Sequence, residues 1–504
     1  MAPEYDIVVI GSGMGGLVCA DILSREGYKV CVVEKNKQLG GCLQTFSRRK
    51  IIFDSGVHYI GGLCEGHNLY QIFKYLGLMD RLKLERIDVD AFDKIIMEND
   101  EKEYAFAQGY DRFIASLVKD FPAEEEGIKK YCDKIREVCS RFPLYNLRSG
   151  GSYTEKESVL NMDAEEFIAS CTKDLKLRAV LGGNNILYAG QGGKTPFYVH
   201  ALILNHYIES SWKCIDGGSQ ISKLLAENIR KAGGEIIRNA EVVSIRVENE
   251  KATHVLLKNG AVIAGRHFIS NLHPVQTIAM TDSPMLKPAY RNRIKSLENT
   301  ISSFTVNLIF KKDRFPYFSH NYYYHREGHL WKMEKYTEEN WPLGYAFFLS
   351  AGRGKQKFAE SASIIAYMRF DEMAPWADTF NTASYPENRG DDYAAFKKRK
   401  AEKLLDCLEE KFPGIKECID CYYVATPLSY RDYIGTTDGS MYGVAKNVND
   451  VLKTFISART RIPNLYLTGQ NLNLHGILGA TMSGLVTCIT LLGNESVVEK
   501  IKNA

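Results

Sequence analysis

The chain has 504 residues, more than one compact core accommodates, so we expect two or more domains. Hydrophobic residues make up 45% and charged residues 25% of it, the balance of an ordinary globular protein. The formal net charge of +3 is too small, and Lys and Arg are too dispersed, to indicate a nucleic-acid partner. Twelve cysteines in so long a chain fit reduced thiols better than a disulfide framework, which predicts a cytoplasmic location.

The first 34 residues predict a strand, a glycine loop, a helix and a second strand. The apolar run at 5–10 enters the loop directly, so we expect no signal peptide. Gly11 permits the tight turn, Gly13 lets the backbone approach a pyrophosphate, and Gly16 lets helix and sheet pack closely. The start of the helix offers free N–H groups to phosphates. Glu34 ends the second strand, where an acid accepts hydrogen bonds from a ribose and repels a 2′-phosphate.

NAD and FAD sites share this fingerprint, and the residues after Glu34 favour FAD. The Gly40-Gly41 pair lets the chain pass close to an extended ligand, and residues 53–62 form a further strand and turn. An NAD enzyme has no need for this continuation, whereas FAD needs it for the ribityl arm and the isoalloxazine ring. The sequence therefore predicts an FAD site.

Two motifs carry a resemblance to a known family. The runs Gly-Gly-Cys-Leu-Gln-Thr-Phe at 40–46 and Phe-Asp-Ser-Gly-Val-His-Tyr-Ile-Gly at 53–61 resemble those of the phytoene desaturase, carotenoid isomerase and retinol saturase group of flavoproteins, most of all its saturases. The likeness extends along the whole chain. Residues 213–216 (Lys-Cys-Ile-Asp) depart from it, because the family carries Tyr-Pro before the two glycines, in a segment expected near the substrate tunnel.

The resemblance extends the cofactor site to the middle and the C-terminal part of the chain. In the family's pattern, a backbone N–H and C=O at the position of Val243 lie beside the adenine. The turn at 468–471 contacts the ribityl and the pyrophosphate, and the next helix points its N-terminus at the flavin, where its dipole would stabilise the reduced ring. Asn471 replaces an aspartate that such flavoproteins carry. The motifs together predict FAD contacts at Gly11, Gly13, Met14, Gly15, Gly16, Glu34, Lys35, Gly40, Gly41, Val243, Gly469, Gln470 and Leu478.

We expect an α/β fold: a Rossmann-type FAD-binding domain of the glutathione reductase and amine oxidase kind, with an interleaved α+β substrate domain. The predicted FAD-binding domain comprises residues 1–63, 206–290 and 430–504, and the substrate domain residues 64–205 and 291–429. Residues 476–493 are rich in Gly and Thr and barely long enough for a membrane span, which favours a buried helix.

Within the predicted substrate domain, residues 64–205 are mostly helical by pattern, with a hairpin at 94–107. Strands are expected at 304–310 and 364–368, and an amphipathic helix at 393–412. Aromatic residues in this region favour a packed core over a tunnel: Tyr322, Tyr323, Tyr324, Trp331, Phe347, Phe348 and Trp376.

The flavin would carry the redox step, while the protein supplies orientation and electrostatics. The turn after Gly56 should approach the flavin ring, so His58 and Tyr59 are the candidate catalytic residues, with His475 in reserve. The family register brings Cys42 close enough to the ring for a thiol role, although a small buried filler fits it better. No metal site is predicted, because Cys418 and Cys421 lack a second ligand pair.

Three functions remain open on the sequence. The first is a saturase, or a desaturase or isomerase of the same family, acting on a polyene or isoprenoid lipid, with NAD(P)H as a candidate electron donor. The second is a flavin amine oxidase, which would need an aromatic cage around the flavin. The third is a non-enzymatic protein like the GDP-dissociation inhibitors, which the intact flavin motifs disfavour. A lipophilic substrate also suggests a peripheral membrane contact, although no strongly basic amphipathic helix marks one.

Overall fold

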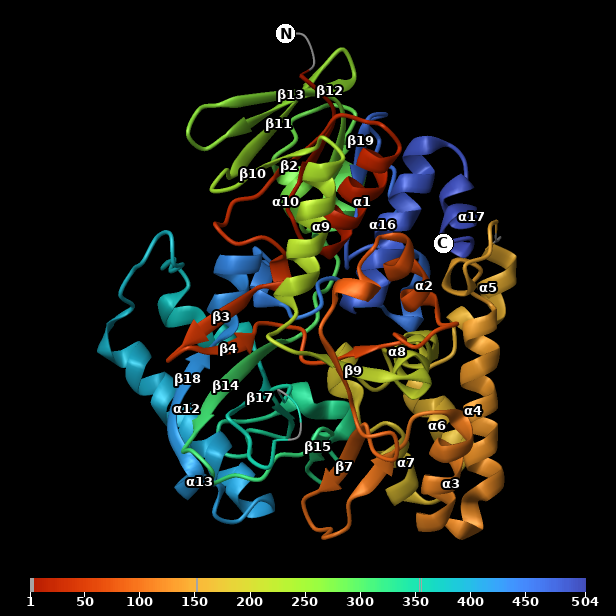
Figure 1. Cartoon of the computed structure of the whole chain (residues 1–504), viewed down its shortest axis with the longest axis vertical. Helices are drawn as coiled ribbons and strands as arrows, with labels where there is room; N and C mark the ends of the chain where they lie inside the picture. Colours follow the sequence, from red (N-terminus) through yellow and green to blue (C-terminus); the bar gives the residue numbers. More distant parts are fainter. Residues whose placement is uncertain (1–3, 151–152, 353, 355) are drawn as a thin grey trace.

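The computed structural model describes residues 4–150, 153–352, 354 and 356–504. Two large β-sheets with surrounding helices build this part of the chain, one in the upper half and one in the lower half of Figure 1. The predicted α/β fold, a Rossmann-type sheet with an interleaved second part, is confirmed. Within the described ranges, no helix is both long and apolar enough to cross a membrane.

The upper sheet has the strand order β10-β2-β1-β13-β12-β11, with β19 beside β13. β1 and β2 are parallel neighbours, as the strand–loop–helix–strand pattern predicts, and β10, β13 and β19 extend the parallel part. β11, β12 and β13 form an antiparallel meander at one edge. The strands are β1 (Tyr5–Ile10), β2 (Val30–Val33), β10 (Glu235–Ile237), β11 (Val242–Glu248), β12 (Lys251–Leu257), β13 (Val262–Ser270) and β19 (Leu465–Leu467).

Two helices pack closely beside the parallel strands. α1 (Met14–Arg25) follows the glycine loop directly, and α16 (Gly476–Leu492) is the buried helix expected at 476–493. α1 packs against α16 and against α9 (Ser219–Lys231). A Cβ on Gly16 would lie only 2.3 Å from the carbonyl oxygen of Gly11, so this approach requires glycine.

The lower sheet has the order β18-β14-β17-β16-β15-β7-β8. The predicted hairpin at 94–107 is the antiparallel pair β7 and β8, and the predicted strands at 304–310 and 364–368 lie in β14 and β17. β7 is also the parallel neighbour of β15, from a distant part of the chain. The strands are β7 (Asp93–Met97), β8 (Tyr104–Phe106), β14 (Ser302–Phe310), β15 (Asn321–His325), β16 (Gly344–Leu349), β17 (Ser361–Met368) and β18 (Ile419–Ala425).

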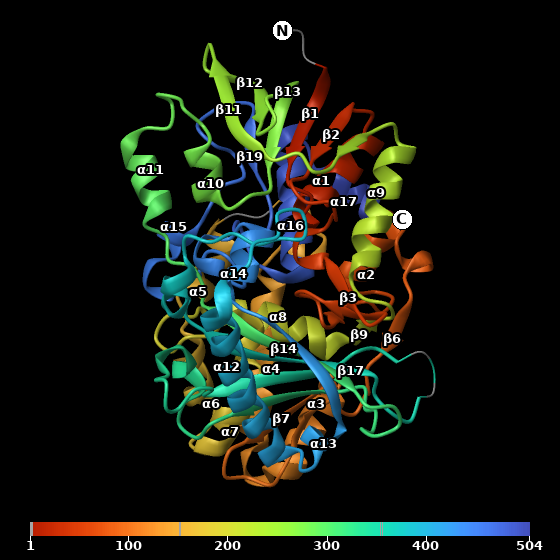
Figure 2. The same cartoon turned by 90° about the vertical axis from the view of Figure 1, so that its left-hand side faces the viewer.

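Helices surround the lower sheet, and Figure 2 shows α12, the amphipathic helix expected at 393–412, lying across it. Residues 64–205 are mostly helical, as predicted. The remaining helices, in both halves, are α2 (Asn68–Tyr75), α3 (Tyr110–Asp120), α4 (Glu125–Ser140), α5 (Tyr153–Leu160), α6 (Ala164–Cys171), α7 (Leu175–Leu181), α8 (Phe197–Glu209), α10 (Pro274–Ala279), α11 (Pro288–Lys295), α12 (Gly390–Lys411), α13 (Ile415–Cys418), α14 (Pro427–Ser429), α15 (Val451–Thr454) and α17 (Ser496–Lys502).

Short strands connect the two halves. β9 (Ser211–Cys214) pairs with β5 (Ile60–Gly61) on one side and with β6 (Leu84–Arg86) on the other. A separate hairpin, β3 (Thr45–Arg48) with β4 (Ile51–Asp54), lies just before β5. The predicted domain boundary between residues 205 and 206 falls inside α8, so both predicted domains share this helix. The division into domains stays a prediction.

A buried ion pair fixes the turn at 430–434. Asp432 is fully buried, and its carboxylate accepts hydrogen bonds from Arg389 and from Nε of Arg431, the latter at 2.8 Å. It also accepts from the backbone N–H of Asn381 at 2.9 Å, and its carbonyl oxygen accepts from Nζ of Lys35 at 2.9 Å. The turn is thus tied both to the loop before α12 and to the end of β2.

We expect Arg389→Ala to lower the free energy of unfolding by about 3 kcal/mol, because the buried carboxylate of Asp432 then loses one of its two arginine partners. Arg136→Ala is the matched control, since Arg136 pairs with Asp133 on the surface, where the two side chains are 49% and 67% exposed. Such a pair contributes up to ~1 kcal/mol. Urea unfolding measures both variants, and equal losses would contradict the role given to Asp432.

Candidate functional site

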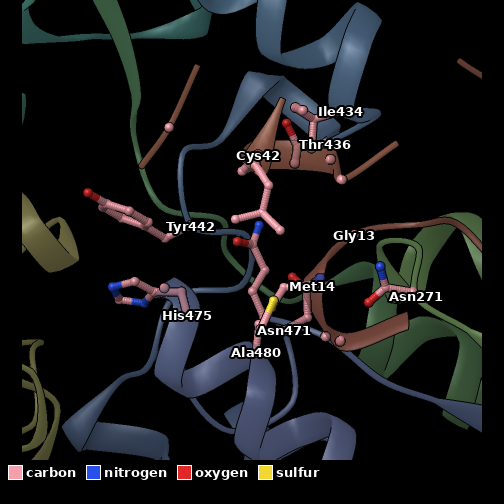
Figure 3. Close-up of a pocket in the computed structure, with 18 of the residues that line it drawn as sticks. Gly13, Met14, Cys42, Asn271, Ile434, Thr436, Tyr442, Asn471, His475 and Ala480 are labelled. Atoms are coloured by element: carbon pink, nitrogen blue, oxygen red, sulfur yellow. The ribbon is translucent and has the colours of Figure 1, made fainter. Parts of the chain in front are cut away.

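A cavity of about 550 Å³ is lined by residues from the edge of the upper sheet and from the lower sheet. Figure 3 shows Met14, Cys42, Tyr442, Asn471 and His475 around one part of it. Among the predicted site residues, Gly16 alone lies outside the lining, because it packs on Gly11 instead. The others all line it: Gly11, Gly13, Met14, Gly15, Glu34, Lys35, Gly40, Gly41, His58, Tyr59, Val243, Gly469, Gln470 and Leu478.

The glycine loop brings the backbone of α1 to the cavity wall. Gly11 has a φ of +90°, which allows β1 to turn sharply into the loop. Met14 and Gly15, the first residues of α1, line the cavity, so the helix directs its unpaired N–H groups and positive dipole end into it. This wall suits a pyrophosphate.

Glu34 stands beside this helix start in a fixed orientation. Its Oε2 accepts hydrogen bonds from the backbone N–H of Ser12 at 2.9 Å and from the Ser12 hydroxyl at 2.6 Å. Its Oε1 accepts from the backbone N–H of Asn36 at 2.8 Å. A carboxylate oxygen has a second lone pair, and Glu34 lines the cavity, so a ribose diol can be bound there.

The next residue, Lys35, also lines the cavity, where burial lowers its pKa. The carboxylates of Glu34, Glu241 and Asp432 oppose that shift.

Val243 lies in a β-bulge on the edge strand β11. The pairing register passes from Val242 opposite Leu257 to Ser244 opposite Leu256, so Val243 has no opposite residue on β12. The extra residue of a bulge leaves its backbone groups out of the ladder. This gives a physical reason for the expected adenine contact, because the backbone N–H and C=O of Val243 are available at the cavity wall.

The C-terminal wall comes from the turn after β19 and the start of α16. Gly469 has a φ of +94°, and the first turn of α16 lines the cavity up to Ala480. Asn471 uses its Oδ1 to accept from the backbone N–H of Val444 at 3.0 Å. Nζ of Lys446 donates to the carbonyl oxygens of Asn471 and Leu472 at 3.1 and 2.8 Å, and burial lowers its pKa to about 7.

These walls fit an FAD. Helix α1 presents its N-terminus to the place expected for the pyrophosphate, Glu34 presents a carboxylate to the place expected for the ribose, and the bulge at Val243 lies where the adenine is expected. A second helix N-terminus, at Gly476, lines the same cavity. We call the region around His58 and Phe348, at the lower sheet, the far part of the cavity. Among the described residues, His, Cys, Asp and Glu side chains form no group that could hold a metal ion.

His58 lies in the far part of the cavity, where its ring stacks on Phe348 with 4.7 Å between ring centroids. Its Nε2 is buried and bonds to none of the described residues. Burial, aided by the charge of Lys213, lowers the pKa of His58 to about 4, so the ring is neutral at physiological pH.

Tyr59 has two polar partners. Its hydroxyl donates to Oδ2 of Asp93 at 2.9 Å and lies 2.7 Å from the hydroxyl of Tyr323. Its ring packs 4.4 Å from that of Tyr207, measured between centroids. Burial raises its pKa well above the ordinary tyrosine value.

His475, the reserve candidate, and Cys42 also line the cavity. Nε2 of His475 lies 3.0 Å from the carbonyl oxygen of Leu187, and the ring stacks on Tyr442. Burial lowers the pKa of His475 to about 4 and raises that of the Cys42 thiol to about 11. Both groups are therefore uncharged near neutral pH.

Several lining residues were not assigned a role from the sequence. Asn271 fills the space between the loop and the turn after β19, and Tyr207 comes from α8. Of the seven aromatic residues judged to favour a packed core, Tyr323 and Phe348 line the cavity, and the remainder lie elsewhere in the described structure. Successive side chains of β15 and β16 point to opposite faces of the sheet, but the sequence does not show which face borders a cavity.

We expect Glu34→Gln to weaken FAD binding about 10- to 100-fold. The NH2 group of Gln would point at the N–H donor of Ser12 or Asn36 and could not accept its hydrogen bond. A hydrogen bond to a charged group contributes ~1.5–3 kcal/mol. Glu248→Gln, on the exposed end of β11, is the control and should leave the affinity unchanged. Flavin fluorescence during reconstitution of the cofactor-free protein measures both. Wild-type affinity in Glu34→Gln would refute the assigned role.

Comparison with known proteins supports this assignment. A sequence model of the family described as flavin containing amine oxidoreductase matches residues 14–337, well over half of the chain. The chain is 27% identical to an all-trans-retinol 13,14-reductase of Danio rerio, over 98% of this chain and 86% of the relative. It is 26% identical to a chloroplastic prolycopene isomerase of Daucus carota, over 96% of this chain and 79% of the relative.

The fold also occurs among solved structures. The structure of cyclohexylamine oxidase from Brevibacterium oxydans superposes with a TM-score of 0.62 at 14% identity, over 99% of this chain and 100% of that one. At this identity the likeness shows a shared fold. Taken with the family match and the cavity, it shows that the chain belongs to the flavin-containing amine oxidoreductase family and is an FAD-dependent oxidoreductase.

Proposed function

We propose that this enzyme is a saturase that reduces a carbon–carbon double bond of a polyene or isoprenoid lipid, with a retinol-like compound as its substrate. The observation that carries the proposal is the apolar far part of the cavity, continuous with the predicted FAD site. It is lined by Ile186, Leu187, Leu202, Ile203, Tyr207, Phe348 and Ile365. A site with this apolar lining suits an apolar ligand.

The chain's own residues have three tasks in this reaction. The glycine loops, Glu34 and the bulge at Val243 hold and orient the cofactor, and the apolar lining excludes water. When bound, the flavin supplies two-electron redox chemistry. A proton for the second alkene carbon must come from the protein or from water, and His58 and Tyr59 are the proposed sources.

The same site would also serve a desaturase or an isomerase of the same substrate class. NAD(P)H as the electron donor, and a cytoplasmic location, remain parts of the proposal. An amine oxidase is the alternative from another class, since Tyr442 and His475 supply a stacked ring pair in the cavity.

The decisive experiment is anaerobic. The photoreduced protein is mixed with all-trans-retinol or a carotenoid, and the return of oxidised flavin absorbance and the product mass are followed. A gain of two mass units coupled to reoxidation is expected for a saturase, and an unchanged mass would indicate an isomerase. If no polyene reoxidises the flavin while amines reduce it, the enzyme is an amine oxidase.

A lipophilic substrate favours a membrane surface as its source, and one region offers a contact. On and just after α15, Leu452 is 69% and Phe455 58% exposed, beside the exposed Lys453. Arg293 of α11 donates to the carbonyl oxygens of Lys453 and Phe455 at 3.0 and 3.2 Å, which adds a second cation. We propose that this surface touches an anionic lipid bilayer.

The double variant Leu452→Ser, Phe455→Ser should bind vesicles containing phosphatidylserine at least about tenfold more weakly, since each buried apolar side chain contributes about 1.5–3 kcal/mol. Leu175→Ser is the control, because Leu175 is 75% exposed but lies on α7, outside the proposed contact surface. Vesicle co-sedimentation gives the result. Unchanged sedimentation of the double variant would remove this surface from the proposal.

A further inference from the structure

A fully buried carboxyl group lies directly behind Tyr59. Asp93 is the first residue of β7, and its Oδ2 accepts the hydrogen bond of the Tyr59 hydroxyl at 2.9 Å. Its Oδ1 accepts from Nδ2 of Asn321 on β15 at 3.0 Å. Asp93 does not line the cavity, whereas Tyr59 and Tyr323 do. The tyrosine hydroxyls thus stand between the carboxyl group and the space for a ligand.

Tyr59 cannot act as an acid alone. Burial raises its pKa well above the ordinary value, so a bare phenolate at this position is costly. The hydroxyl can release a proton to a ligand only if it gains another at the same time. Oδ2 of Asp93 lies 2.9 Å from that oxygen. A protonated Asp93 can therefore donate to the Tyr59 oxygen, in place of the hydrogen bond that the hydroxyl gives to the ionised carboxylate, and Asp93 is the group placed to supply the second proton.

The charge of a buried lysine on β9 acts on the same carboxyl group. Lys213 is 1% exposed, and its Nζ donates to the carbonyl oxygen of Leu349 at 2.9 Å. It stands directly opposite the partly exposed Glu85 on β6. Burial lowers its pKa to about 8, while the charges of Glu85 and Asp93 oppose the shift.

We propose that Tyr59 and Asp93 form a two-step proton relay, in which Tyr59 gives its hydroxyl proton to the substrate carbon and Asp93 gives its carboxyl proton to Tyr59. The relay rests on the proposed saturase function. Tyr59 is the catalytic residue, and Asp93 acts through it. Of the two proton sources proposed above, we assign the step to Tyr59, because burial and the charge of Lys213 disfavour protonation of the His58 ring.

The relay balances. A carbon–hydrogen bond forms as the O–H bond of Tyr59 breaks, and a new O–H bond forms on Tyr59 as that of Asp93 breaks. The two electrons and the other hydrogen come from the reduced flavin that the proposed function requires. The positive charge of Lys213 stabilises the carboxylate left on Asp93, and a proton from water restores the carboxyl group before the next turnover.

Asp93 can hold this proton in the physiological range. Burial raises its pKa to about 7, against the opposing effects of Asn321, Tyr59, Asn184 and Lys213. Tyr323 and Tyr207 are the other titratable groups whose charges couple to it, and both stay protonated because burial raises their pKa values too. Asp93 therefore carries its proton below about pH 7 and loses it above.

The activity test compares Tyr59→Phe and Asp93→Asn with two controls. Tyr322→Phe removes a hydroxyl from the same strand as Tyr323, where it donates to Glu103, and Asp100→Asn removes a carboxyl from the turn between β7 and β8. Reoxidation of the reduced flavin by the polyene should slow about 100-fold in Tyr59→Phe, the usual scale for a lost general acid. Asp93→Asn should be slow and independent of pH between 6 and 9, whereas the wild type slows above about pH 7. The controls should match the wild type.

A second measurement needs no substrate. Infrared difference spectra of the protein with bound FAD should show the band of a protonated carboxyl group at pH 6. This band should disappear by pH 9 and should be absent in Asp93→Asn. The raised pKa also predicts that the wild type gains stability relative to Asp93→Asn below about pH 4, and loses this gain as the pH rises from about 4 to about 7. Urea unfolding across this range measures the change.

Three outcomes would overturn the relay: Tyr59→Phe reacting at the wild-type rate, a wild-type pH profile that persists in Asp93→Asn, or an Asp93 carboxyl already ionised at pH 5. If the wild-type protein reacts with no polyene, the proposed function fails and so does the transfer to carbon. Whether Asp93 stores a proton is then decided by the infrared titration alone.

Discussion

The close approach of three backbone segments around Asn271 is the constraint on which the rest of the site depends. Its backbone N–H donates to the carbonyl oxygen of Ile10 at 2.9 Å, which fixes it at the end of β1. Its side chain would lie 2.5 Å from a Cβ on Gly13, 3.0 Å from one on Gly15 and 2.4 Å from one on Gly469. Since only glycine tolerates this proximity, these positions bring the start of α1 and the turn before α16 onto one cavity.

Desolvation organises the chemistry at the other end of the cavity. Burial moves titratable groups there toward their uncharged forms: it lowers the pKa values of His58 and His475 to about 4 and raises that of Cys42 to about 11. A wall of neutral groups suits an apolar ligand, because no ion has to lose its hydration when the ligand enters. The polar partners of the cofactor are gathered at the opposite end, around Glu34.

The local parts of the site could be predicted from the sequence, because strand, loop, helix and acid follow one another over 34 residues and each glycine has a steric reason. The position of Val243 came from the family pattern, and the bulge supplies its physical cause. The Tyr59 hydroxyl group could be named as a candidate, but not its partners. Asp93 and Tyr323 are 34 and 264 residues away along the chain, and they meet it only because β7 and β15 are parallel neighbours. No spacing in the sequence encodes that register.

The cavity is assembled from segments that lie far apart along the chain, from Ile10 to Ala480. Synthesis on the ribosome produces the glycine loop first and the wall formed by α16 hundreds of residues later. A nascent chain that has folded β1, α1 and β2 already presents a phosphate-binding loop, but it lacks the turn that closes over it. The complete wall of the cavity therefore exists only after translation has passed residue 480.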